Sequence, residues 1–434
     1  MTRITVVYHI LMLLTTGALL VYFRRRTSVA ALCHGGIFGL TAALGLGFLI
    51  GDFNCKFAVP VAGRLNVVPL TSDLRLFAQG LFLEGTLYLL GAGLLSFRAK
   101  KKALGVGAAL LALIVGAVGV DALLIEPYAL DVRKMSIESE KITKPIRIVF
   151  VSDVQSDRIG AYERQVFAQI KAQNADLILL GGDYVQLSRS SIVRENRPFD
   201  NRRGRFGLAK NLGDDWNRFL KEEKLAAPLG VYAVSGFPHE EKLAADWFAG
   251  TGVEYIEKSR AIRLTDELAL LALTGNDSRS AGEATFPLPT LLQESADSPF
   301  LIRLGHVPTH FFHPDRANLL LAGHTHGGQV RLPILGPIFT MTPNLPRFMA
   351  SGHFRLPQDR LPQDRHSQTQ HSQADVIPSD GASADAIVSN GVGMERSFAP
   401  RVRFLCRPDF WVIELLPKGG FSQSQFADET SALP

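Results

Sequence analysis

The stretch "IRIVFVSD", residues 146–153, is a short apolar run that ends in an aspartate. β-Branched and aromatic residues dominate it, as is typical of a strand buried on both faces. A second run, "ADLILLGGD" at 175–183, repeats the design and also ends in an aspartate. Between the two, "YERQVFAQIKAQN" at 162–174 carries apolar residues at helical spacing. The order of strand, helix and strand predicts a parallel β-α-β unit and hence an α/β domain.

Further apolar runs follow along the chain, and most of them lead into a glycine, a histidine or an asparagine. They lie at 228–236, 268–277, 300–308, 318–328, 386–391 and 410–417. Open α/β sheets place their binding and catalytic groups beyond the carboxyl ends of the strands. We therefore expect the chemistry of this domain at its strand ends.

The first part of the chain has a different composition. Four apolar stretches lie at 4–23, 29–50, 76–97 and 103–125. Each is close to the ~20 residues that a helix needs to cross a bilayer, so we expect four transmembrane helices. A cleaved signal peptide is the alternative for the first stretch, but its arginines follow the apolar run instead of preceding it. His34, Glu84 and Asp121 lie in or at the ends of these stretches, and we assign them no role.

The basic residues form short clusters beside the apolar stretches. Net charge is +5, and the clusters at 24–26 and 98–102 are typical of membrane flanks, so we expect no nucleic-acid partner. Lys and Arg number seven in the turns between helices one and two and between helices three and four, against four on the other side. By the positive-inside rule, everything after residue 125 lies outside the cytoplasm, on the periplasmic or outer face of a cell membrane. The three cysteines indicate neither a disulfide framework nor a zinc knuckle.

These observations divide the chain into consecutive parts. We expect a transmembrane region at 1–126, a linker at 127–143, an α/β domain at 144–417 and a tail at 418–434. Two inserts interrupt the domain, at 186–227 and 355–386. The second contains the tandem "LPQDRLPQDR" and few apolar residues, so we expect it to be disordered.

Carboxylates and imidazoles recur where strands end. Asp153 and Asp183 close the first two strands, His306 follows a later one, and His324 and His326 lie in the turn "GHTHGG" after the next. A single histidine after a strand is usually an ordinary loop residue. Five oxygen and nitrogen donors at successive strand ends, two of them in a glycine-rich turn, favour a metal site on one rim of the sheet.

These motifs resemble the calcineurin-like metallophosphoesterases, and in particular their membrane-linked branch with the "GHTHGGQ" motif. The resemblance covers about residues 146–416, including the tail "VSNGVGMERSFAPRVRFLCRPDFWVIEL". It implies a four-layer β-sandwich flanked by helices and two divalent metal ions. Of Mn, Mg, Fe and Zn, we expect Mn, because residue 155 is a glutamine whose amide oxygen replaces an imidazole. It also implies hydrolysis of phosphomonoesters, phosphodiesters or pyrophosphates.

The resemblance also implies a role for each matching residue. Asp153 and His326 would hold the first metal, His306 and His324 the second, and Asp183 would bridge the two ions. Two bridged cations polarise a phosphoryl group and lower the pKa of a shared water, which agrees with the donors found at the strand ends. Asp183 is therefore expected to be needed for catalysis.

The chain departs from the family pattern at two motifs. In "SDVQSD" at 152–157, Gln155 stands where the family has a metal-binding histidine, and we expect its amide oxygen to ligate the same ion. In "SGFPHEE" at 235–241, the asparagine ligand of the second metal is missing. His239 aligns with the family's catalytic histidine after a one-residue insertion, so we expect it to protonate or stabilise the leaving group.

Two functions follow from these expectations. The first is a membrane-anchored metal-dependent phosphoesterase that cleaves phosphodiester or pyrophosphate bonds. A lipid-linked phosphate is one expected substrate, as for the UDP-2,3-diacylglucosamine hydrolases that this chain resembles, and membrane lipid is the expected partner. The alternative is a catalytically degenerate metallophosphoesterase domain that serves as an extracytoplasmic binding or sensing module.

The charge bias generates a topology prediction. Alkaline phosphatase fused after Pro127 should be active, and a fluorescent protein that matures only in the cytoplasm should be dark when fused at the same point. The reason is that the bias of Lys and Arg places this point outside the cytoplasm. Silent alkaline phosphatase together with bright fluorescence would reverse the predicted orientation.

Overall fold

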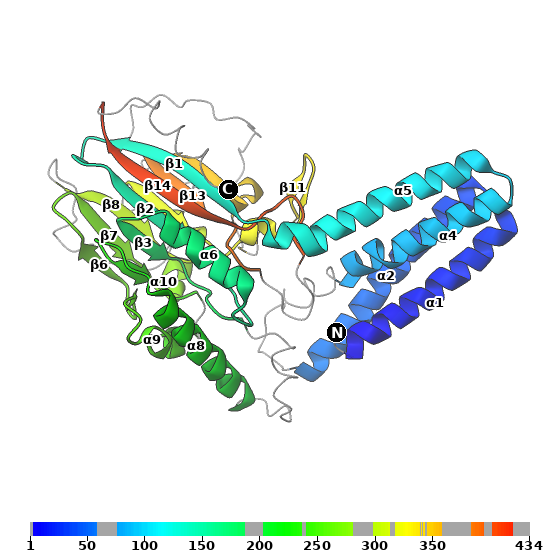
Figure 1. The fold of residues 1–434 in the computed structure, drawn as a ribbon, viewed down its shortest axis with the longest axis horizontal. Helices are drawn as coiled ribbons and strands as arrows, with labels where there is room; N and C mark the ends of the chain where they lie inside the picture. Colours follow the sequence, from blue (N-terminus) through cyan, green and yellow to red (C-terminus); the bar gives the residue numbers. More distant parts are fainter. Residues whose placement is uncertain are drawn as a thin grey trace. The chain divides into compact units, whose positions relative to one another are not determined.

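The computed structural model of the chain describes eleven segments. They are residues 3–58, 76–186, 203–236, 240–280, 298–312, 317–338, 340, 342, 345–357, 383–394 and 402–419. The chain forms two compact units, which are drawn in Figure 1. The first unit comprises residues 1–129, 186–210 and 394–407, and the second comprises 130–185, 211–393 and 408–434.

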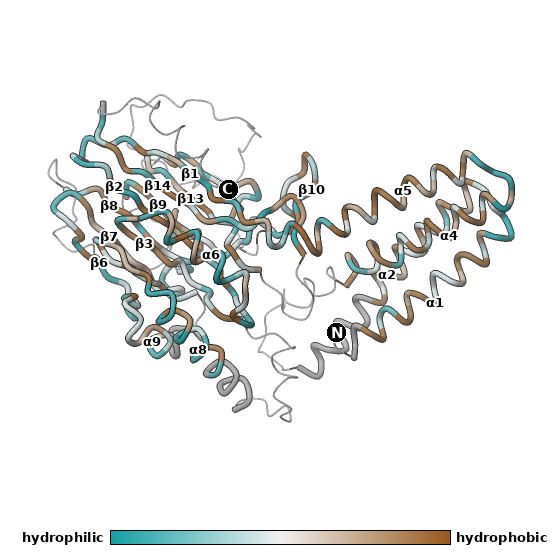
Figure 2. Tube along the Cα trace, in the orientation of Figure 1, coloured by the Kyte–Doolittle hydropathy of each residue, from teal (hydrophilic) through white to brown (hydrophobic). Residues whose placement is uncertain are grey.

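The first unit is built of long apolar helices. They are α1 (Arg3–Arg26), α2 (Val29–Ala58), α4 (Glu84–Arg98) and α5 (Lys102–Val120), and a π-helical turn (Asp121–Ile125) and a 3-10 turn (Glu126–Tyr128) follow α5. Four spans are long and apolar enough to cross a membrane: Val6–Arg26, Val29–Leu46, Leu76–Arg98 and Lys102–Tyr128. Figure 2 shows them as mostly hydrophobic traces. The prediction of four helices that are long and apolar enough to cross a membrane is thus confirmed.

One charged group inside this bundle has a defined partner. Nδ1 of His9 lies 2.7 Å from Oε1 of Glu84, and both side chains are largely buried. An ionisable group at membrane depth is costly unless it is paired. The pairing of Glu84 therefore agrees with a structural role inside the bundle.

The first sheet of the second unit has six strands in the order β1-β14-β2-β3-β4-β5. They are β1 (Asp131–Ser139), β14 (Asp409–Pro417), β2 (Ile146–Val151), β3 (Leu177–Leu180), β4 (Val231–Ala233) and β5 (Glu254–Tyr255). Only β14 and β2 pair antiparallel, and the other neighbours are parallel. The β2-α6-β3 unit, with α6 at Ala161–Ala172, confirms the predicted β-α-β motif.

The second sheet also has six strands, in the order β12-β13-β9-β8-β7-β6. They are β12 (Gly352–Pro357), β13 (Ser383–Val388), β9 (Leu319–Ala322), β8 (Phe300–Leu304), β7 (Leu268–Ala272) and β6 (Arg260–Arg263). The four central strands are parallel, and the two edge strands are antiparallel to their neighbours. A separate two-stranded ribbon joins β10 (Arg331–Leu332) to β11 (Gly336–Pro337).

The two sheets share one apolar layer. Phe150 and Leu179 from the first sheet pack in the same buried cluster as Leu270 and Ile302 from the second. Helices α6, α8 (Arg203–Glu223) and α9 (Glu240–Phe248) carry residues of a second cluster on the outer face of the first sheet. The 3-10 helices at Pro308–Phe312 and Arg347–Ala350 contribute to a third cluster on the second sheet. The α/β class is thus confirmed, as two mixed sheets packed face to face.

Two segments have more regular structure than the sequence suggested. Residues 131–139, within the expected linker at 127–143, form the edge strand β1. Polar residues alternate along β1, as suits an edge strand with one solvated face. The strand therefore contains no continuous apolar run that would predict it from the sequence. Helix α8 lies in the expected insert at 186–227 and buries Trp216 in the helix-covered cluster. In the expected insert at 355–386, residues 358–382 lie outside the described part of the chain.

Candidate metal centre

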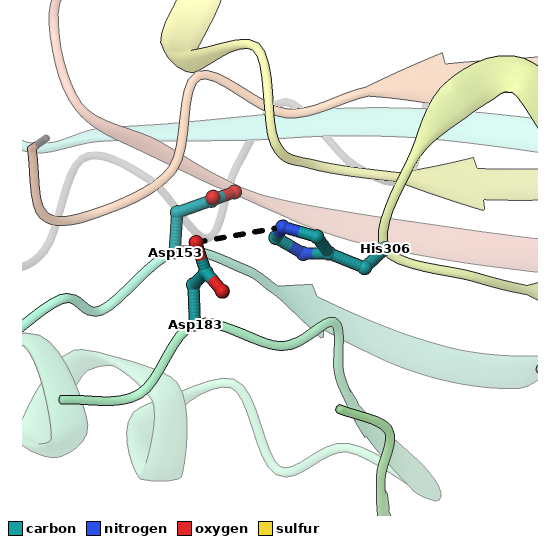
Figure 3. A group of neighbouring side chains, drawn as sticks. All are labelled: Asp153, Asp183 and His306. Atoms are coloured by element: carbon teal, nitrogen blue, oxygen red, sulfur yellow. Dashed lines mark ion pairs between the residues drawn. The ribbon is translucent and has the colours of Figure 1, made fainter. Parts of the chain in front are cut away.

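The strand ends of both sheets meet at one buried group of donors. Asp153 follows β2, Asp183 follows β3 and His306 follows β8. One ligand atom from each of the three lies within 4.8 Å of the others, and all three side chains are buried. Figure 3 shows both carboxylates beside the imidazole ring of His306. Residues more than 150 positions apart in the sequence are thus brought together because each follows a central strand.

A backbone carbonyl sets the orientation of the His306 ring. Nδ1 of His306 lies 2.8 Å from the carbonyl oxygen of Gly181, so Nδ1 carries the proton and donates it. Nε2 then faces Oδ2 of Asp183 at 3.5 Å. Metal-binding histidines usually donate one ring N–H to a carbonyl or carboxylate and coordinate the metal through the other nitrogen. His306 already has this arrangement.

The turn after β9 delivers both of its histidines to the same place. The backbone N–H of His324 donates to Oδ2 of Asp153 at 2.9 Å. The ring of His324 lies 5.1 Å from that of His306, centroid to centroid. Nε2 of His326 lies 3.5 Å from Oδ1 of Asp153. The turn therefore orients one carboxylate with its backbone and surrounds the group with imidazoles.

Gln155 also joins the group, as a hydrogen-bond donor. Its Nε2 donates to Oδ2 of Asp183 at 3.0 Å, and the side chain is buried. This contact holds the carboxylate that the family resemblance assigns to both ions. Ligation of a metal by the Gln155 oxygen stays a prediction.

The backbone is strained at five of the six gathered residues. The φ angles are positive at Asp153 (53°), Gln155 (39°), Asp183 (58°), His324 (69°) and His326 (50°). Positive φ is uncommon for residues other than glycine, and such strain concentrates at functional sites, where the surrounding structure holds it in place. The agreement between these residues and those selected from the sequence supports a functional site independently of any motif.

Two glycines leave room for the carboxylates. A Cβ atom on Gly236 would lie 1.8 Å from Oδ1 of Asp183, and one on Gly323 would lie 2.2 Å from Oδ2 of Asp153. Real Cβ atoms do not approach other atoms this closely. Both positions therefore require glycine for the backbone to pass so close to the acids.

Asp153 is also held by residues that are absent from the predictions made from the sequence. The hydroxyl of Ser152 donates to Oδ2 of Asp153 at 2.7 Å. Behind it, the N–H of Gly393 donates to the Asp153 carbonyl at 2.7 Å. The loop before Gly393 is held by Asp409, whose Oδ1 accepts the N–H of Asn390 at 2.8 Å. A polar residue before a strand-end aspartate was the available signal for Ser152, whereas nothing local marks Asp409.

Burial and charge shift the pKa values within the group. Burial raises the pKa of Asp153 to about 6, with repulsion from Asp183 adding to the effect. Burial also opposes ionisation of Asp183, but the His306 charge and hydrogen bonds outweigh it and lower the pKa of Asp183. Burial disfavours the charged form of His306, yet the nearby carboxylates raise its pKa to about 9. Without a metal ion, His306 is therefore protonated on both ring nitrogens and positively charged at neutral pH.

One predicted catalytic residue lies outside the described part of the chain. His239, expected to act on the leaving group, belongs to residues 237–239, which the structure does not describe. The adjoining Gly236 is described and lies against Asp183. The role of His239 stays a prediction.

No model of a known protein family matches the chain, and no curated protein matches it either. What the described residues provide is a buried group of two aspartates and a histidine that could hold a metal ion.

The charges of the group generate a pH prediction. The pKa of His306 is raised from 6.5 to about 9, so its proton stabilises the fold below pH 6.5, and this contribution is lost as pH rises through about 9. The pKa of Asp153 is raised from 3.8 to about 6, so its contribution is present below 3.8 and is lost through about 6. A divalent cation must displace these protons. The rise in melting temperature on adding Mn²⁺ should therefore grow between pH 6 and pH 9.

That measurement uses the detergent-solubilised full chain with Mn²⁺ or with a chelator at each pH. An equal thermal shift across the range would contradict displacement of a proton from His306.

A second prediction concerns metal preference. An amide in place of imidazole should favour Mn²⁺ or Mg²⁺ over Zn²⁺, so Gln155→His should raise the affinity for Zn²⁺ relative to Mn²⁺. Gln165→His is the matched control, because Gln165 is exposed on α6 and should leave both affinities unchanged. Competition titration with a chromophoric chelator measures the ratio. Equal behaviour of the two variants would show that residue 155 does not contact the ion.

Proposed function

We propose that this protein is a membrane-anchored, metal-dependent phosphoesterase that hydrolyses phosphodiester or pyrophosphate bonds. The observation that carries the proposal is the buried group of Asp153, Asp183 and His306, whose ligand atoms lie within 4.8 Å of one another. Buried acids and imidazoles gathered at strand ends are a common basis of metal-assisted hydrolysis.

The donors in the group suit divalent metals. Carboxylate oxygens and imidazole nitrogens are ligands for Mn²⁺, Mg²⁺, Fe²⁺ and Zn²⁺, and an amide oxygen from Gln155 in place of an imidazole would favour Mn²⁺. The hydrogen bond from Nδ1 of His306 to the carbonyl oxygen of Gly181 leaves Nε2 facing Asp183. Nε2 is then the nitrogen that can coordinate a metal ion. A pair of ions would be held by Asp153 with His326 and by His306 with His324, bridged by Asp183.

When bound, two such ions would polarise a phosphoryl group and lower the pKa of a nearby water. The chain's own residues prepare the site for this charge. Asp153 and Asp183 supply the negative charge that the cations balance, and the Gln155 hydrogen bond keeps Asp183 in place. His239 would donate the proton that the leaving oxygen takes up.

The membrane helices bear on the choice of substrate. Four spans in the first unit are long and apolar enough to cross a bilayer. A tethered domain works within reach of headgroups, so a lipid-linked phosphodiester or pyrophosphate is the substrate class that the tether favours. The bias of Lys and Arg supports a catalytic domain on the extracytoplasmic face.

A specific observation favours a second candidate function. Gln155 replaces an imidazole, and the sequence after Gly236 reads Phe-Pro-His, with no asparagine where the family pattern has one. A domain that binds metal weakly for this reason would serve as an extracytoplasmic binding or sensing module. Metal analysis of the purified full chain, followed by assay on bis-p-nitrophenyl phosphate with added Mn²⁺, distinguishes the two functions. A phosphoesterase binds metal and hydrolyses the diester, whereas a binding or sensing module does not hydrolyse it.

The proposal predicts that Asp183 is the most sensitive position. A bridging carboxylate serves both ions, and its loss leaves two cations to repel each other. Changes to groups that merely orient ligands already cost about 10–100-fold. Asp183→Ala and Asp183→Asn should therefore lower turnover of bis-p-nitrophenyl phosphate by at least ~100-fold.

Asp266→Asn is the matched control, because its carboxylate is fully exposed on the same domain. Thermal melts of all three variants separate loss of activity from loss of fold. Activity at the level of the unmodified protein in folded Asp183→Asn would refute the proposed site.

A further inference from the structure

A short hairpin stands clear of the two sheets of the second unit. Strands β10 and β11 pair in register, with Arg331 opposite Pro337 and Leu332 opposite Gly336. The turn between them reads Pro333-Ile334-Leu335. Figure 1 shows the hairpin, labelled β11, projecting from the sheets, and Figure 2 shows hydrophobic residues along it. We call residues 331–338 the Ile334 hairpin.

The tip of the Ile334 hairpin exposes a run of apolar residues at 332–335, whereas Pro337 in β11 is buried. Ile334 is fully exposed, Leu335 is 67% exposed, and Leu332 and Ile338 are also exposed. Phe348, on the 3-10 helix that follows, is 61% exposed. Single exposed apolar residues are ordinary, but a contiguous group on a projecting element marks a surface that another apolar phase covers.

The hairpin is held in this exposed shape. Ile334 has a φ of 68°, a conformation that β-branched residues rarely adopt. The guanidinium of Arg347 donates from Nε to the carbonyl of Pro337 at 2.8 Å and from Nη2 to that of Leu335 at 3.2 Å. These bonds tie the backbone of the turn to the 3-10 helix that carries Arg347. The exposure is therefore built into the hairpin.

The hairpin is continuous with the metal centre. The N–H of Gln329 donates to the carbonyl of His326 at 2.9 Å, which closes the turn that carries the histidines. The N–H of Ile338 donates to the carbonyl of Val330 at 3.4 Å and closes the base of the hairpin. Only four residues separate His326 from Arg331, the first residue of β10. A tip anchored in an apolar phase would therefore keep the site close to that phase, without any contact from the tip to the ligands.

We propose that the Ile334 hairpin inserts its apolar tip into the lipid bilayer. The same chain carries four spans suited to a membrane, so a bilayer is the apolar phase always within reach. Arg331 and the exposed Arg347 flank the tip and complement anionic headgroups, while Ile334 and Leu335 suit the acyl region. Apolar residues at the end and cations at the base form the pattern of an interfacial anchor.

The insertion also narrows the substrate, and this step rests on the proposed function. A hairpin embedded in lipid next to His326 holds the metal centre at the level of the headgroups. Phosphoesters or pyrophosphates that are anchored in the bilayer by acyl or prenyl chains then meet the site without leaving the membrane. The substrate class is therefore a membrane-anchored phosphate, in preference to a soluble one.

Tryptophan fluorescence of the full chain in nanodiscs tests the insertion directly. The three native tryptophans, Trp216, Trp247 and Trp411, are buried in the domain and give a constant background. Leu335→Trp places a new indole at the exposed tip. Nanodiscs are prepared with phosphatidylcholine and phosphatidylglycerol whose acyl chains are either brominated or plain. Asp266→Trp, at a fully exposed position on the same domain, is the control.

The expected result is a blue-shifted emission from the Leu335→Trp indole that loses most of its intensity in brominated nanodiscs, with no quenching of the Asp266→Trp indole. Unquenched, water-like emission at position 335 would overturn the proposal. Blue-shifted but unquenched emission would also overturn it, because a protein surface, such as a second copy of the chain or its own helices, would then cover the tip.

The substrate step has a separate readout. Ile334→Asp with Leu335→Asp should sharply lower turnover of a lipid-linked pyrophosphate while leaving turnover of bis-p-nitrophenyl phosphate unchanged. Equal turnover of the lipid-linked substrate by the unmodified protein and this variant would overturn the substrate class. Absence of turnover with both substrates in the unmodified protein would instead refute the proposed phosphoesterase, while the quenching result would still decide the insertion.

Discussion

Two carboxylates buried close together form the constraint on which the rest of the second unit depends. Asp153 is fully buried and Asp183 is 2% exposed, so water cannot screen their mutual repulsion. Buried acids persist only where positive charge or hydrogen-bond donors compensate them. Here the imidazole of His306, the amide of Gln155 and the N–H of His324 all face the acids. A divalent cation would provide this compensation more completely than a single proton.

The strands and the turns of the domain contribute differently to holding the two carboxylates together. The apolar layer between the sheets fixes where the strands end, and residues such as Phe150 and Ile302 are fully or almost fully buried there. Beyond the strand ends, the chain adopts conformations that are unfavourable by themselves, with φ of 58° at Asp183 and 69° at His324. A close-packed interior resists small displacements and can therefore hold such turns in place.

Central strands were predictable because a strand buried on both faces is almost entirely apolar, as β3 is throughout and β2 is apart from Arg147. The proximity of Asp153 and Asp183 followed, since parallel neighbours end at the same edge of a sheet. Edge strand β1 escaped prediction because its solvated face is polar. The orientation of Gln155 depends on its own backbone φ of 39°. The role of Asp409 depends on a hydrogen bond that it accepts from the backbone N–H of Asn390, in a separate loop. Neither has a local signature.

The place of the last strand has a consequence for biosynthesis. β14 lies between β1 and β2, which are separated from each other in the sheet until residues 409–417 fill the gap. The ribosome makes those residues long after β1 and β2, so the sheet stays open while the intervening residues are synthesised. Pairing across such a sequence distance is slow to form. A nascent chain would therefore carry an unpaired sheet edge until residues 409–417 emerge, and it would need protection from aggregation during that interval.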